Sequence, residues 1–289
     1  MRVSDEALAE VHDRGFTVVE GFLGGEDLAA AQEALWRIYP HPEDYFANPG
    51  QYADLVATQF SGLRLFPYHD WAINRLAVNP DLVDAAERFC GTDDLDLYKV
   101  ELWAKYSGAV NYDQPHHRDY SNHSVVVPKV DDNFVQMTTF LLLSDVTEND
   151  GPTKAVPLDK TQNVPMYPRF MEQGAFAEDE ISVTGPAGSL LIYKTDVMHR
   201  GSAMVGANRS RFTLLVDFQP RGRAWTGKMA WPDHALSNRW KSAMSKMTTR
   251  QRCLFGFPAP GDPYWDAQTL HDVSLRYPDM EMAPYRAAI

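Results

Sequence analysis

Cysteine is scarce in this sequence. Only Cys90 and Cys253 occur among 289 residues. Two cysteines cannot build a disulfide framework, and their separation does not match the paired spacing of cysteines that bind zinc. Scarce cysteine is typical of proteins in reducing compartments. We therefore expect a cytoplasmic protein without structural disulfides.

Long apolar runs and an excess of basic residues are also missing. No run approaches the ~18 apolar residues of a membrane span, and MRVSDEALAEVHDRG lacks the apolar region of a signal peptide. The 27 Lys and Arg residues are outnumbered by 39 Asp and Glu, which gives a net charge of −12. Nucleic-acid binding needs a basic face. We therefore expect neither a membrane nor a nucleic acid as partner, and the oligomeric state is left open.

The apolar content, 44% of residues, is ample for a folded core, and the pattern predicts one domain over 1–289. Its first part, 1–94, alternates helical periodicity with one β-branched stretch and a long polar segment. The predicted elements are helices over 4–12, 27–39 and 71–90, a strand over 16–22, and a loop with some helix over 41–62. The helix over 71–90 is interrupted near Asn79-Pro80 and stops at Gly91.

Short β-branched and aromatic stretches dominate 95–220. They predict strands at 95–106, 124–130, 134–146, 180–185, 188–197 and 211–219, separated by turn signals. Many short strands at close intervals favour a mainly β fold with flanking helices, a double-stranded β-helix or cupin-like jelly roll. Beyond it, 221–289 is rich in aromatic residues around a helical stretch at 234–255, which indicates a flank of the barrel or a lid.

The segment QPHHRD at 114–119 is the strongest chemical signal. His117 and Asp119 are two residues apart, so on an extended strand both side chains would face one point. His199, far downstream, supplies a second imidazole. Two histidines and one carboxylate with open positions are typical of non-heme Fe(II) oxygenases. His41-Pro42-Glu43 has the same spacing but lies among turn residues, so we interpret it as coincidence.

Two neighbouring histidines are excluded from this set. His116 would face away from His117 in an extended strand, and we expect His123 to be a surface loop residue. On the strand before the motif, Trp103 and Lys105 share a phase, and one of them is expected to line a substrate pocket.

The order of these features resembles the phytanoyl-CoA dioxygenase family of Fe(II)- and 2-oxoglutarate-dependent oxygenases. The resemblance begins at LAEVHDRGFTVVEGFL and continues through His117-x-Asp119, His199 and the run that Arg211 opens. It implies that His117, Asp119 and His199 bind Fe(II), and that Arg211 binds the distal carboxylate of 2-oxoglutarate, with Arg209 as a second candidate. The resemblance also places Ser202 and Phe140 at the cosubstrate. Thr138 shares the strand phase of Phe140, so it is a candidate hydrogen-bond partner for the cosubstrate, with simple strand propensity as the alternative.

The resemblance implies an enzyme that uses O₂ and 2-oxoglutarate to hydroxylate a small-molecule metabolite, releasing succinate and CO₂. Relatives that halogenate lack the carboxylate ligand, and Asp119 is kept here, so hydroxylation or another oxidation such as desaturation is expected. Alternatives are a cupin-like binding or sensing protein without turnover, an acyl-CoA hydroxylase, and a zinc hydrolase, which Arg211 disfavours. The basic cluster Arg221-Gly222-Arg223 with Lys228 is small for a CoA, so we expect a substrate that is not CoA-linked. The segments 41–62 and 225–247 are expected to form its lid.

Overall fold

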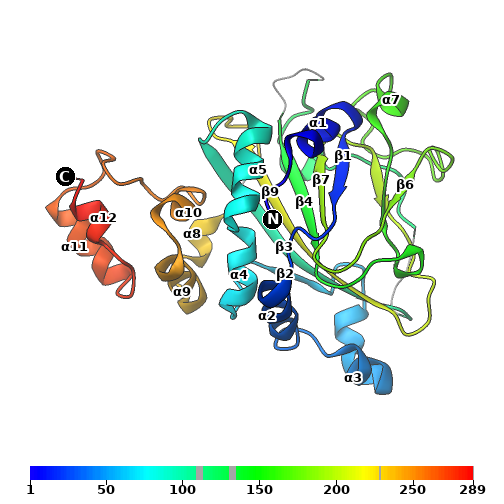
Figure 1. The fold of residues 1–289 in the computed structure, drawn as a ribbon, viewed down its shortest axis with the longest axis horizontal. Helices are drawn as coiled ribbons and strands as arrows, with labels where there is room; N and C mark the ends of the chain where they lie inside the picture. The colour runs from blue at the N-terminus through cyan, green and yellow to red at the C-terminus, as the bar shows by residue number, and fades with distance from the viewer. Residues whose placement is uncertain (109–112, 130–134, 228, 289) are drawn as a thin grey trace.

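Two antiparallel sheets form the centre of the molecule. The computed structural model describes residues 1–108, 113–129, 135–227 and 229–288. In the larger sheet the strands lie in the order β1-β7-β4-β9-β3-β2, and in the smaller one in the order β6-β5-β8 (Figure 1). The larger sheet consists of β1 (Phe16–Val19), β2 (Leu63–Leu65), β3 (Leu95–Tyr106), β4 (Met137–Leu142), β7 (Leu190–Lys194) and β9 (Ser210–Pro220). The smaller one consists of β5 (Thr153–Ala155), β6 (Ile181–Val183) and β8 (His199–Gly201).

Side chains alternate between the two faces of the larger sheet. Along β9, Phe212, Leu214, Val216 and Phe218 enter the main core, whereas Arg211, Thr213 and Leu215 face a cavity between the sheets. The fold is therefore a jelly roll whose outer face is packed against helices and whose interior is open to a ligand, as the strand pattern predicts.

A β-bulge in β3 sets which of its side chains face the cavity. The register with β9 shifts between Leu97 and Lys99, so Tyr98 is the extra residue. Before the bulge Leu97 packs in the outer core, and after it Lys99 lines the cavity although the two residues are two apart. Strict alternation along β3 would put Lys99 on the outer face with Leu97 and not on the cavity wall.

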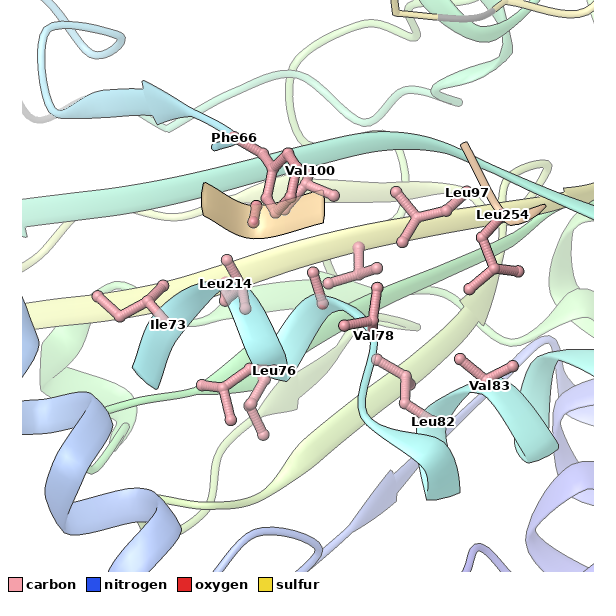
Figure 2. Close-up of a cluster of buried hydrophobic side chains, with 14 of the residues drawn as sticks. Phe66, Ile73, Leu76, Val78, Leu82, Val83, Leu97, Val100, Leu214 and Leu254 are labelled. Carbon is pink, nitrogen blue, oxygen red and sulfur yellow. The ribbon is translucent and has the colours of Figure 1, made fainter. Parts of the chain in front are cut away.

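Helices from the first third of the chain cover the outer face. They are α1 (Asp5–Arg14), α2 (Gly25–Leu35), α3 (Pro42–Ala47), the 3₁₀ helix η1 (Pro49–Val56), α4 (Trp71–Ala77) and α5 (Pro80–Cys90). Figure 2 shows Ile73, Leu76 and Leu82 of this layer against Val100 and Leu214 of the sheet. The predicted break is confirmed, since Asn79 caps α5 with its side chain and Gly91 ends it in the left-handed region.

The C-terminal segment adds α8 (Trp231–His234), α9 (Asn238–Lys246), α10 (Thr249–Cys253), α11 (Ala267–Arg276) and α12 (Ala283–Arg286). It is tied to β3, because Leu97 N–H donates to Leu254 O at 2.8 Å and the Trp231 indole donates to Leu97 O at 3.2 Å. In Figure 1, α11 and α12 lie at the end of the molecule, beyond α8 to α10. The segment flanks the outer helices and contributes none of the described residues that line the cavity.

Some sequence predictions fail locally. The strand predicted at 124–130 does not form over its described residues, which contain one isolated bridge, Ser124 to Thr226. Val125 is 84% exposed and does not pack against a neighbouring strand. A β-branched composition therefore did not suffice to form a strand here. Residues 130 and 134, which the predictions included, lie outside the described part. The three-residue strands β2, β5 and β8 were not predicted because they are too short to show alternation.

Three short elements complete the order: α6 (Tyr120–His123), η2 (Glu148–Asp150) and α7 (Leu158–Thr161). Among the described residues, no helix has both the length and the apolar character to cross a bilayer.

Candidate active site

His117, Asp119 and His199 come together at the inner side of the jelly roll. One ligand atom from each lies within 4.8 Å of the others, so the set could hold a metal ion. His199 Nε2 is 3.2 Å from Asp119 Oδ2, and His117 Nε2 is 3.6 Å from Asp119 Oδ1. Two imidazoles and a carboxylate suit a divalent transition metal and leave room for further ligands.

The backbone that brings these residues together is not one continuous strand. His117 and His199 face each other across an antiparallel bridge, with N–H to O distances of 2.8 and 2.9 Å. Asp119 has φ −80° and ψ −8°, and the chain turns there into α6. Asp119 therefore lies at the start of a turn and not inside a continuous strand, and its carboxylate meets the two imidazoles from there.

Main-chain carbonyls fix the orientation of both rings. His117 Nδ1 lies 2.9 Å from Pro115 O, and His199 Nδ1 lies 3.0 Å from Val197 O. Each Nδ1 must carry its proton to donate to a carbonyl. In a neutral ring the lone pair is then on Nε2, the atom that faces Asp119. This is the tautomer that a metal site requires. Although burial opposes it, Asp119 raises the pKa of His199, so a metal ion would displace a proton from that ring.

The charges in the triad are coupled. Burial lowers the pKa of His117 to about 4, so this ring is neutral and able to act as a ligand at pH 7. Burial opposes ionisation of Asp119, yet the neighbouring histidines, His199 above all, hold the pKa of Asp119 well below its usual value. The site therefore presents a carboxylate at neutral pH.

Tyr193 supports the carboxylate from β7. Its hydroxyl donates to Asp119 Oδ2 at 3.1 Å, and its ring is buried and stacks on Phe140 with centroids 6.0 Å apart. Tyr193 was not predicted from the sequence, since a tyrosine in an apolar strand gives no sign that it meets a residue 74 positions away. It holds one oxygen of Asp119 in place.

A cavity of about 240 Å³ opens beside the triad. Its wall combines apolar residues with several charged ones, and both sheets contribute. Residues of the wall include His117, Asp119, His199, Lys99, Glu101, Trp103, Lys105, Phe140, Leu191, Thr153, Val183, Arg169, Arg211, Thr213 and Leu215. Leu55 to Gly62, from the segment predicted as a long loop, close part of the wall.

Gln114 ties that covering segment to the metal-binding strand. Its side chain accepts from Gly201 N–H at 2.8 Å and donates to Gln59 Oε1 at 3.1 Å. Gly201 ends β8, the strand that His199 begins. The cover over the cavity is thus linked through one side chain to the backbone beside the triad.

Arg211 and Lys105 form a pair of cations in the cavity. They lie directly opposite each other in the ladder of β9 and β3, and both line the wall. Burial lowers the pKa of Arg211 to about 10, so it remains charged. Burial and then Arg211 lower the pKa of Lys105 to about 8. Like charges placed opposite each other destabilise a sheet unless an anion joins them.

The hydrogen bonds of this pair go to main-chain oxygens. Lys105 donates to Ser202 O at 3.0 Å, and Arg211 donates to Gly151 O. Neither forms an ion pair with a carboxylate of the described chain. Gly151 has φ 61°, and a Cβ there would lie 2.7 Å from Ser202 O, so glycine is needed at this close approach. Two adjacent cations on the cavity wall could together bind an anionic ligand.

Two predicted cosubstrate residues lie elsewhere. The Ser202 hydroxyl donates to Pro152 O at 2.7 Å, and Thr138 is fully buried with its hydroxyl 3.2 Å from that of Thr195. Neither belongs to the cavity wall, whereas Phe140 does. Thr138 shares the face of Phe140 but is paired in register with Asp217, deeper in the barrel. Arg211 and Phe140 thus line the cavity, whereas Ser202 and Thr138 do not, and the roles of all four at a cosubstrate stay predictions.

Arg209 has a structural partner. Its guanidinium donates to both oxygens of Asp150, at 2.6 and 2.8 Å, and it is absent from the cavity wall. The register of β9 places Arg209 just outside the strand and Arg211 inside it. The tertiary structure therefore favours Arg211 for an anionic ligand.

His116, His41 and His123 lie outside the group that could hold a metal ion among the described residues. His116 is fully buried and its Nε2 lies 2.9 Å from Glu180 Oε2, away from the triad as expected. His41 caps α3 far from the set. The surface position expected for His123 is wrong, because it is 1% exposed and hydrogen-bonds Tyr98 at 2.5 Å. His123 ends α6, and its two ring nitrogens lie near the Tyr98 hydroxyl and the Lys99 ammonium.

The basic cluster weighed for a CoA is partly engaged by the protein itself. Arg221 pairs with Asp96 at 3.0 Å and Asp94 at 3.5 Å, and Arg223 lies over the Trp225 ring. Lys228 lies outside the described residues. Two of the three basic residues are therefore already occupied by the protein.

The chain matches the family model described as phytanoyl-CoA dioxygenase (PhyH) over residues 11–213. The chain belongs to the phytanoyl-CoA dioxygenase family. The matched range includes the triad, Lys105 and Arg211. No curated protein matches the chain by sequence.

Solved structures share the fold at low sequence identity. The non-heme alpha ketoglutarate dependent epimerase SnoN from nogalamycin biosynthesis is 17% identical, with 74% of this chain and 80% of that chain covered and a TM-score of 0.54. HygX from Streptomyces hygroscopicus, solved with nickel and 2-oxoglutarate bound, is 14% identical, with 76% and 87% covered and a TM-score of 0.54. The carbocyclase SnoK is 14% identical, with 79% and 88% covered and the same TM-score. These likenesses support the fold.

Proposed function

We propose that this protein is an Fe(II)- and 2-oxoglutarate-dependent dioxygenase that hydroxylates a small-molecule metabolite, with release of succinate and CO₂. The observation that carries the proposal is the set of His117, Asp119 and His199, with ligand atoms within 4.8 Å of one another on the wall of a cavity. Family membership and metal-bound, 2-oxoglutarate-bound relatives of the same fold support it.

The residues fit divalent iron. Both imidazoles are held as Nδ1–H tautomers by Pro115 O and Val197 O, so their Nε2 lone pairs are available. Asp119 adds one negative charge, steadied by Tyr193. Three protein ligands leave positions for a chelating cosubstrate and O₂.

The cation pair fits the cosubstrate. Arg211 provides a planar fork for the distal carboxylate, and Lys105, directly opposite, adds a second charge. Phe140 and Leu191 supply apolar wall to the carbon chain. A dianion bound there would relieve the repulsion between the two cations.

Bound iron, with O₂ and 2-oxoglutarate, supplies the oxidising power, while the protein positions the reactants and excludes water. Asp119 keeps a ligand position that halogenating relatives leave to chloride, which favours hydroxylation among the possible outcomes. The segment from Leu55 to Gly62 helps to enclose the substrate, and Gln114 holds that segment to β8.

The substrate is proposed to be a compact metabolite without CoA. Arg221 is engaged by Asp94 and Asp96, which reduces the positive charge that this cluster offers to the phosphates of a CoA. Turnover of phytanoyl-CoA that Arg221→Ala abolishes would contradict this part of the proposal.

The test is consumption of 2-oxoglutarate and release of succinate by purified protein with Fe(II), ascorbate and O₂, in the wild type and in Asp119→Ala. Asp119-dependent succinate release is expected, and candidate metabolites that raise its rate identify the substrate. Metal and 2-oxoglutarate binding without succinate release under any condition would instead favour the binding or sensing protein. Hydrolytic activity with Zn²⁺ and no response to 2-oxoglutarate would favour a hydrolase.

A further inference from the structure

We propose that the substrate is a ring that carries adjacent hydroxyl groups, a sugar or a cyclitol, and that Glu101, Lys99 and Trp103 recognise it. This inference rests on the proposed function, because it assigns the part of the cavity that the metal and cosubstrate leave free. The three residues follow one another on the inner face of β3, before Lys105.

Glu101 is a hydrogen-bond acceptor on the cavity wall, and neighbouring side chains fix its orientation. The residue is 8% exposed, and its two oxygens are held separately, one 3.3 Å from Lys99 Nζ and the other accepting from the Trp103 indole N–H at 3.2 Å. A carboxylate offers about four acceptor positions, so two partners fix its orientation and leave capacity for donors from a ligand. A buried carboxylate must be paired and hydrogen-bonded, and Lys99 and Trp103 meet that requirement while the group stays on the cavity wall.

Lys99 places a donor next to that acceptor. Its ammonium lies 3.5 Å from His123 Nε2 as well as 3.3 Å from Glu101. Although burial opposes it, Asp217 and Glu101 raise the pKa of Lys99, so the side chain is cationic. A hydroxyl group both donates and accepts, and two neighbouring hydroxyls match a neighbouring carboxylate and ammonium.

Aromatic surface adjoins the polar pair. The Trp103 ring lies 5.7 Å from the Phe60 ring, with 59° between their planes, and both line the cavity. The C–H face of a saturated ring can pack on such surface while its hydroxyls reach Glu101 and Lys99. Trp103 thus serves twice, as packing surface and as the donor that orients Glu101.

The charges on the cavity wall bear on whether the ligand is neutral, cationic or anionic. Glu101 and Lys99 neutralise each other, which favours an uncharged polar ligand over a cation or an anion. Arg169 also lines the cavity and would favour an anionic ring. Rings of similar size and different charge therefore distinguish the possibilities.

The experiment is calorimetric titration, without O₂, of protein loaded with Fe(II) and 2-oxoglutarate. The probes are methyl β-D-glucopyranoside and myo-inositol, compared with cyclohexanol, cyclohexanecarboxylate and cyclohexylammonium. We expect methyl β-D-glucopyranoside or myo-inositol to bind at least about tenfold more tightly than each of the three comparison compounds. The better of the two probes indicates whether a sugar or a cyclitol is the closer match.

Variants then assign the contacts. Glu101→Gln should weaken binding of the hydroxylated ring by about tenfold, and Trp103→Leu by at least as much. Trp103→Phe keeps an aromatic face and removes only the bond to Glu101, so its effect should be smaller. Glu172→Gln, on an exposed side chain outside the cavity wall, is the matched control and should bind as the wild type does.

The inference would be overturned if cyclohexanecarboxylate, cyclohexylammonium or cyclohexanol bound more tightly than the two polyhydroxylated rings. It would also be overturned if neither polyhydroxylated ring bound, or if Glu101→Gln bound them as the wild type does. The proposed function is judged separately by titrating 2-oxoglutarate into the Fe(II)-loaded wild type. If 2-oxoglutarate binds and the hydroxylated rings do not, only the substrate class is wrong. If 2-oxoglutarate does not bind, the proposed function fails, and the ring titrations on the Fe(II) protein still decide the role of Glu101.

Discussion

Lys105 and Arg211 are direct cross-strand partners, two cations facing each other on the wall of one cavity. The pKa of Lys105 is lowered to about 8, by burial first and Arg211 second. Lys105 is therefore protonated below pH 8, and an anion bound between the two residues would hold its proton to higher pH. The relationship gives the site a pH dependence that can be measured.

We predict that the affinity for 2-oxoglutarate is constant below about pH 8 and falls above it, by up to about tenfold per pH unit. In Lys105→Met the affinity should be weaker at pH 7 and flat from pH 7 to 9, since the titrating group is gone. The measurement is 2-oxoglutarate binding to the Fe(II) protein across this range. The same pH slope in both proteins would show that Lys105 does not contact the cosubstrate.

Arg211→Ala should cost about 2 to 5 kcal/mol of 2-oxoglutarate binding, because the site loses an enclosed charged partner. Arg211→Lys should recover only part of the loss, since a point charge replaces a planar fork. Arg209→Ala is the matched control: it breaks the pair with Asp150 and leaves the cavity wall intact. A raised 2-oxoglutarate KM in Arg209→Ala with a normal one in Arg211→Ala would transfer the role to Arg209.

His199→Ala and Asp119→Ala should each abolish stoichiometric Fe(II) binding, because two remaining ligands cannot hold the ion in competition with water. Metal content after anaerobic loading and desalting measures this. His41→Ala, which alters a helix cap far from the triad, should retain one Fe(II) per chain. Wild-type stoichiometry and affinity in both ligand variants would refute the assignment.

Tyr193→Phe removes the hydroxyl that donates to Asp119 Oδ2 at 3.1 Å. Losing such an outer partner typically weakens metal binding by about 10- to 100-fold, and we expect a loss in that range. Tyr285→Phe, another buried tyrosine whose hydroxyl meets Arg252, is the control for loss of a buried hydroxyl. Equal metal affinity in Tyr193→Phe and the wild type would show that Asp119 needs no such support.

Glu180 is a carboxylate on which stability should depend at low pH. It accepts from Arg200 at 2.6 Å and from Lys154 at 2.9 Å, and although burial opposes ionisation these cations lower its pKa from 4.5 to about 2. A depressed carboxylate pKa adds stability that is full above about pH 4.5 and disappears as the pH falls through about 2.

Glu180→Gln should therefore lower the free energy of unfolding by about 3 kcal/mol at pH 7, with a smaller difference near pH 3. Urea unfolding at both pH values tests this, with Glu178→Gln, an exposed neighbour, as control. A difference from wild type that is the same at pH 3 and pH 7 would show that the carboxylate charge is not the cause.

The start of α1, the break before α5, the end of α5 and the ligand order are properties that the sequence alone determined. Ser4, Asn79 and Gly91 act locally, through side-chain caps or a left-handed backbone, so their effect is visible without tertiary contacts. The long strand β3 was predicted with its observed bounds, because twelve residues give enough pattern. The order of His117, Asp119, His199 and Arg211 is likewise independent of distant packing.

Only the tertiary structure decided where several of these side chains point. The bulge at Tyr98 changes the phase of β3, which puts Lys99 and Glu101 on the cavity wall, and the register of β3 with β9 places Lys105 opposite Arg211. A bulge and a register result from pairing between segments more than a hundred residues apart, so neither can be read from local periodicity.

Hydroxyl groups were the least predictable part of the site, because their direction depends on which acceptor lies nearest in the folded chain. Ser202 meets Pro152 O, Thr138 meets Thr195, and Tyr193 reaches Asp119, each across at least 50 residues of sequence. The Asp119 carboxylate likewise meets His199, which lies on the distant strand β8. The sequence thus determined the ligand types and their order, and long-range pairing determined their geometry.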